Sequence, residues 1–94
     1  MSRADRVAYL LNRFGNKAQW NGQTLHILLR PTQTGERDCR RYFCIAPAAF
    51  LPYVGDAVTC LENTYTVLRA DGKFVQGERV YSTAVLELND RWGR

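Results

Sequence analysis

The sequence predicts a mainly β protein, a small antiparallel β-barrel of five to six strands with a short N-terminal α-helix. Helical spacing of apolar residues is confined to the first fourteen residues, whereas a period of two dominates from residue 17 onward. Short extended runs are separated by Asn-Gly and Asp-Gly turns, and 94 residues are too few for a nine-stranded sandwich. A chain of this length buries one modest core, so residues 1–94 are expected to form a single domain.

The first expected element is a helix over about residues 3–14. Ser2 followed by Asp5 resembles a capping box, and Gly15-Asn16 is expected to end the helix in a left-handed conformation. The apolar stripe consists of Val7, Leu10, Leu11 and Phe14. A helix this short needs a partner surface, which is either the barrel itself or a neighbouring subunit.

The barrel is expected over about residues 17–88 and opens with a hairpin around Asn21-Gly22. In the run from Gln23 to Arg30, an apolar face of Leu25, Ile27 and Leu29 alternates with a more polar face. His26 belongs to the polar face, where a single histidine is expected to be structural. Pro31 ends the run.

The middle of the chain holds a polar loop, residues 31–38, and an expected strand, residues 39–45. Each face of that strand carries an Arg and an aromatic residue, so the pattern leaves open which face is buried. The next segment, residues 46–53, is apolar but contains two prolines, which argue against ladder pairing. It either packs over an end of the barrel or is presented to a partner.

The last half alternates β-prone runs with short turns and closes the expected barrel. Its elements are a strand over 57–61, a turn at Glu62-Asn63, a strand over 64–70, a hairpin turn at Asp71-Gly72, an interruption at 76–78, a strand over 79–88 and a frayed tail over 89–94.

Charge and cysteine content narrow the function classes. Thirteen basic against nine acidic residues give a net charge of +4, but Arg40-Arg41 is the one adjacent basic pair, so no concentrated nucleic-acid stripe is visible. Three cysteines without a secretion signal or a C-x-x-C pair argue against a disulfide framework and a zinc site. No apolar run reaches the length of a membrane span, and the chain is expected in the cytoplasm during expression.

Catalytic motifs are not found in the sequence. It contains no nucleophile elbow, no phosphate loop and no dinucleotide fingerprint, and His26 is its single imidazole. The candidate acid–base carboxylates belong to Asp38, Asp56, Asp71 and Glu78. Three of them stand in expected turns, where they serve the backbone or face water. We therefore expect no catalytic residue, no cofactor and no small-molecule substrate.

A nucleic-acid-binding barrel is the alternative function. Small barrels bind single strands by stacking bases on aromatic side chains beside arginines. Trp20, Arg41, Tyr42 and Phe43 are the residues that would form such a surface here.

The segment from about Ala46 to Leu88 resembles a family of phage proteins. It contains Tyr-Val-Gly-Asp-Ala-Val at 53–58, Asn-Thr-Tyr-Thr-Val at 63–67 and a closing strand over 80–88. This order is similar to that of the head-completion (stopper or head–tail joining) and other minor structural proteins of tailed phages and prophages. The resemblance covers about half of the chain.

The resemblance implies a non-enzymatic virion protein that acts through protein–protein contacts. Such proteins are small barrels that stack as a ring between the portal-adaptor complex and the tail, with a loop toward the channel that helps to hold packaged DNA. The expected partners are other virion proteins and copies of the chain itself, with at most a weak contact to DNA. Stopper, tail-completion and other minor virion roles remain open. So does the choice between the loops 31–38 and 46–52. The expected contact residues are Arg37, Arg40, Arg41, Phe50, Leu51 and Tyr53.

Overall fold

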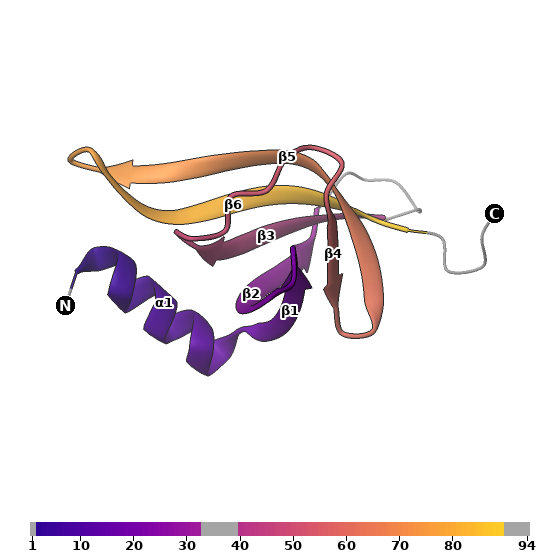
Figure 1. The fold of residues 1–94 in the computed structure, drawn as a ribbon, viewed down its shortest axis with the longest axis horizontal. Helices are drawn as coiled ribbons and strands as arrows, with labels where there is room; N and C mark the ends of the chain where they lie inside the picture. The colour runs from indigo at the N-terminus through magenta and orange to yellow at the C-terminus, as the bar shows by residue number, and fades with distance from the viewer. Residues whose placement is uncertain (1, 33–39, 90–94) are drawn as a thin grey trace.

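The computed structural model describes residues 2–32 and 40–89 (Figure 1). Its elements are α1 (Arg3–Phe14), β1 (Asn16–Trp20), β2 (Gln23–Pro31), β3 (Arg41–Pro47), β4 (Ala57–Cys60), β5 (Asn63–Val75) and β6 (Glu78–Leu88). The strands form a closed barrel in the order β1-β2-β3-β6-β5-β4, and every neighbouring pair is antiparallel. The predicted fold class is therefore confirmed.

Helix α1 has the predicted bounds and capping box. The Ser2 hydroxyl accepts a hydrogen bond from the Asp5 amide at 3.1 Å, and the Asp5 carboxylate accepts one from the Ser2 amide at 3.4 Å. The helix lies against β2, β3 and β6, and Leu11 is the buried member of its stripe. Gly15 is extended rather than left-handed, because the chain passes directly from the helix into β1.

The first hairpin follows the prediction. Asn21 and Gly22 have positive φ values of 53° and 73°, which suit a two-residue turn. Leu25 and Ile27 are buried, and Leu29 packs against the core.

Strand β3 settles the question of which face is buried. Its inward residues include Cys44 and Ala46, which have no exposed surface, while Phe43 and Ile45 lie on the outer face. Pro47 ends the strand opposite Tyr81. The expectation that residues 46 and 47 lack ladder pairing is thus wrong, because a proline is tolerated at the end of a strand.

The second hairpin turn lies further along the chain than predicted. β5 continues through Asp71-Gly72, and the chain reverses at Gln76 and Gly77, whose φ values are 53° and 82°. Pairing with β6 overrides the local preference, since it places Gly72 beside Ser82 on the inner face. Register shifts between Val67 and Arg69 and between Lys73 and Phe74 accommodate the long hairpin.

Two smaller boundaries also differ from the prediction. The β4–β5 turn is formed by Leu61 and Glu62, one residue earlier, and both have positive φ. Asn89 is not frayed: its amide donates to the Thr64 carbonyl, and its side-chain oxygen accepts from the Thr66 hydroxyl. The rest of the predicted tail, 90–94, lies outside the described residues.

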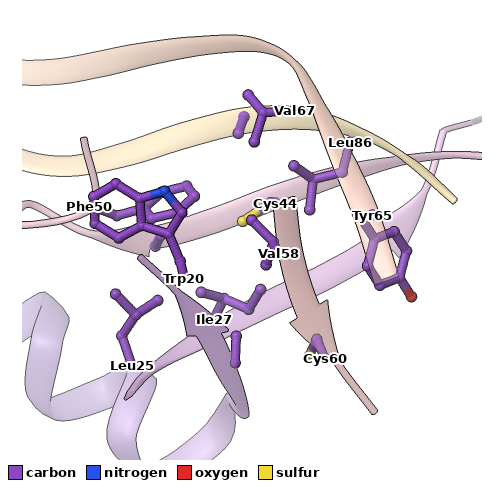
Figure 2. Close-up of a cluster of buried hydrophobic side chains, with 13 residues drawn as sticks. Trp20, Leu25, Ile27, Cys44, Phe50, Val58, Cys60, Tyr65, Val67 and Leu86 are labelled. Atoms are coloured by element: carbon purple, nitrogen blue, oxygen red, sulfur yellow. The ribbon is translucent and has the colours of Figure 1, made fainter. Parts of the chain in front are cut away.

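The buried side chains form one cluster inside the barrel, in which Trp20 and Phe50 lie far from Tyr65 (Figure 2). The rings of Trp20 and Phe50 pack edge to face with their centres 5.1 Å apart, and those of Tyr42 and Tyr65 pack in the same way with their centres 5.4 Å apart. The buried residues are Ala18, Trp20, Leu25, Ile27, Cys44, Ala46, Phe50, Val58, Cys60, Tyr65, Val67, Ala84 and Leu86. Cys44 and Cys60 are thus buried thiols, as expected, while Cys39 lies outside the described residues.

Candidate docking loop

The connection from β3 to β4 contains the most exposed apolar side chains of the described residues. We call residues 50–56 the docking loop. Its first member, Phe50, has no exposed surface and packs against Trp20 in the core. The expectation that Phe50 contacts a partner is therefore wrong, because its ring fixes the loop to the barrel instead.

Asp56 organises the other end of the docking loop. Its Oδ2 accepts hydrogen bonds from the Trp20 indole Nε1 and from the Tyr53 amide, each at 3.0 Å. The Asp56 amide in turn donates to the Tyr53 carbonyl at 3.0 Å. The indole bond, followed by the Tyr53 amide, lowers the pKa of the Asp56 carboxyl below its ordinary value of 3.8, since both stabilise the carboxylate.

Backbone bonds to β5 complete the attachment. The Gly55 amide donates to the Val67 carbonyl at 2.8 Å, and the Val67 amide donates to the Asp56 carbonyl at 2.9 Å. Gly55 has a φ of 97°, a conformation that L side chains rarely adopt. The loop thus has a fixed backbone although it belongs to no strand.

Between these attachments the side chains of Leu51, Tyr53 and Val54 point into solvent, with exposed fractions of 53%, 80% and 73%. A fixed backbone with three exposed apolar groups suits contact with an apolar surface. Leu51 and Tyr53 were expected as contact residues, whereas Val54 was missed. The signal that could have found Val54 is its position directly before Gly55, where the turn directs the side chain outward.

The expected basic contact residues do not join this surface. Arg37 lies outside the described residues. The Arg40 guanidinium donates to the Leu88 carbonyl at 2.7 Å and thereby joins the start of β3 to the end of β6. Arg41 is exposed, but it begins the seven-residue strand β3, whereas Phe50 follows the end of that strand. The described members of the expected set therefore fall into two separate regions.

The four residues of the nucleic-acid alternative do not share a surface either. Trp20 is 8% exposed, and its indole N–H is already bonded to Asp56. Tyr42 faces inward against Tyr65, while Arg41 and Phe43 face outward. The stacking surface expected from these four residues is therefore not assembled.

The described candidate carboxylates do not gather in one site, and Glu78 stands apart from Asp56 and Asp71 at the start of β6. Asp56 holds the docking loop, Asp71 lies 3.5 Å from the Arg69 guanidinium on the surface, and Asp38 is outside the described residues. Within residues 2–32 and 40–89, no three His, Cys, Asp or Glu side chains gather as metal ligands would. No helix in the described part of the chain has the length and apolar character of a membrane span.

Comparison with known proteins adds no relative. The chain matches no protein-family model, no curated protein and no solved structure at a significant level.

Proposed function

We propose that this protein is a non-enzymatic structural component of a phage or prophage particle, which docks on a neighbouring virion protein through Leu51, Tyr53 and Val54. The observation that carries the proposal is the docking loop itself: three exposed apolar side chains on a backbone held by the buried Phe50 and by Asp56. Its residues 53–56 also belong to the Tyr53–Val58 segment, one of the three segments on which the sequence resemblance to head-completion proteins rests.

The docking loop is preorganised for binding. A flexible loop loses conformational entropy when it binds, which offsets much of the gain from burying apolar surface. Here the loop is ordered before binding, through the Trp20–Asp56 bond and the bonds to Val67. Less of the free energy from burying Leu51, Tyr53 and Val54 is then lost to ordering the loop on binding.

The role that fits this arrangement is a rigid spacer in the head–tail region, either as a connector or head-completion component or as a tail-completion component. The barrel supplies a fixed body, and the docking loop supplies one contact with the portal-adaptor complex or with a tail component. Exposed apolar side chains also lie on α1, where Leu10 and Phe14 are 51% and 66% exposed. A component with several neighbours needs more than one such surface.

Deletion of the gene from the phage or prophage genome that carries it tests the proposal. We expect electron microscopy of the resulting lysate to show heads that lack attached tails, and the wild-type gene supplied in trans to restore tailed particles. Normal tailed particles from the deletion strain, or a genome that produces no particles, would overturn the proposal.

A further inference from the structure

The β5–β6 hairpin extends beyond the barrel. β5 pairs with β4 only through residues 63–66, and the docking loop bonds to Val67. From residue 69 to residue 75, β5 pairs with β6 alone, and no described strand lies on its other side. Figure 1 shows this hairpin (orange to yellow) reaching past the barrel above α1. Its edge therefore carries backbone groups that a further strand could pair with.

The Arg79 side chain packs across the projecting hairpin. Its guanidinium donates to the Ser82 hydroxyl at 3.1 Å and lies 5.7 Å from the centre of the Phe74 ring. It also covers Gly72 so closely that a Cβ atom there would come within 2.5 Å of Nη1. These contacts restrict the hairpin before pairing and so reduce the entropy that pairing costs.

Charges of alternating sign mark the outer face of this edge. Arg69, Asp71 and Lys73 lie on the face opposite to the Gly72 side, and Arg69 already contacts Asp71 along the strand at 3.5 Å. Charged side chains at a sheet edge usually oppose pairing with another strand, and charges of one sign along this edge would do so. Alternating charges instead select a register, because opposite charges attract and like charges repel across a strand pair.

The charges on β5 distinguish between the possible registers of two paired copies. If two copies pair antiparallel with Asp71 at the centre, Asp71 faces Asp71 and Arg69 faces Lys73. Both are pairs of like charge, so this register is repulsive. If Gly72 is at the centre, Asp71 of each copy faces Lys73 of the other, which is attractive. The same register places Ala70 beside Phe74, whose ring is 59% exposed in the single chain.

We propose that the free edge of β5 binds the same edge of a second copy, antiparallel and centred on Gly72, so that two barrels share one continuous sheet around a twofold axis. The inference does not depend on the proposed function, since the docking loop is a different surface and the pairing is a property of the purified chain.

Sedimentation equilibrium of the full chain over a wide concentration range tests this pairing. We expect a monomer–dimer equilibrium in the wild type. Asp71→Lys and Lys73→Asp should each weaken dimerisation about tenfold, because each removes two attractive pairs and creates two repulsive ones. The double variant with both changes should restore the wild-type affinity. High salt should reduce these differences.

Lys17→Asp is the matched control, since Lys17 is an exposed cation on β1, and it should leave dimerisation unchanged. Circular dichroism of each variant verifies that the barrel is folded. A monomer at every concentration would overturn the proposal. So would a dimer that neither single variant weakens. If Asp71→Lys weakened the dimer and Lys73→Asp did not, the Gly72-centred register would be wrong, because a register centred on Ala70 pairs Asp71 with Arg69 instead.

Discussion

The indole Nε1 of Trp20 donates a hydrogen bond of 3.0 Å to Oδ2 of Asp56, across 36 residues of sequence. The bond connects the end of β1 to the residue directly before β4, and it leaves the Trp20 ring free to pack against Phe50 in the core. One tryptophan thus contributes to both the interior of the barrel and the shape of the docking loop.

The Trp20–Asp56 bond should make stability depend on pH in the acid range. The folded-state pKa of Asp56 is lowered, so its stabilising contribution is fully present above its ordinary value of 3.8 and is lost as the pH falls through the lower folded value. We expect Asp56→Asn to be less stable at neutral pH and to lose less stability than the wild type below about pH 4. Thermal unfolding followed at several pH values measures both. Trp20→Phe should likewise make stability depend less on pH in the acid range. If stability changed with pH in the same way in the wild type and in both variants, the Trp20–Asp56 bond would not be the cause.

Substitution of the buried residue of the docking loop should lower the stability of the protein far more than substitution of the exposed residues. Phe50→Ala removes a completely buried ring and should destabilise the fold by about 3–5 kcal/mol. Leu51→Asp and Tyr53→Asp alter exposed side chains and should each change stability by no more than about 0.5 kcal/mol. Urea unfolding of the purified variants gives these values. A large loss of stability in Leu51→Asp or Tyr53→Asp would show that these side chains belong to the core.

Gly15→Ala should destabilise the junction between α1 and the barrel. A Cβ atom at this position would lie 2.7 Å from the Leu11 carbonyl oxygen and 2.8 Å from the Ile27 carbonyl oxygen, and both belong to rigid backbone. We expect a net cost of about 1–3 kcal/mol, even though alanine restricts the unfolded chain more than glycine does. Amide exchange should accelerate in the last turn of α1. An unchanged melting temperature would mean that the helix can move away from β2.

The buried thiols should resist modification in the folded protein. Burial is the main cause that raises the pKa of Cys44 to about 12, so the reactive thiolate is scarce at neutral pH, and burial also raises the pKa of Cys60. In a Cys39→Ser background, a thiol reagent should label neither residue until denaturant is added. Fast labelling without denaturant would indicate that the barrel opens locally.

The sequence was sufficient for those elements in which local chemistry and tertiary structure agree. The capping box of α1, the Asn21-Gly22 turn and the apolar face of β2 all have short-range signals, and the structure confirms each. The prediction of a turn at Asp71-Gly72 was wrong because ladder pairing between β5 and β6 outweighs the local turn preference. That pairing involves contacts that no local sequence pattern contains.

The docking loop illustrates the same limit. Its apolar composition was visible, but the division into a buried Phe50 and an exposed Leu51 and Tyr53 depends on Trp20, far away in sequence. Which strand face of β3 is buried was likewise decided by its neighbours, β2 and β6, rather than by its own alternation.

We propose that Leu51 and Tyr53 bind a neighbouring virion protein. The most direct test supplies the Leu51→Asp/Tyr53→Asp double variant in trans to a deletion strain and counts tailed particles by electron microscopy, with Leu61→Asp, an exposed leucine in the β4–β5 turn, as the matched control. We expect the double variant to fold and to fail to restore tails, while the control restores them. Normal numbers of tailed particles with the double variant would contradict the claim.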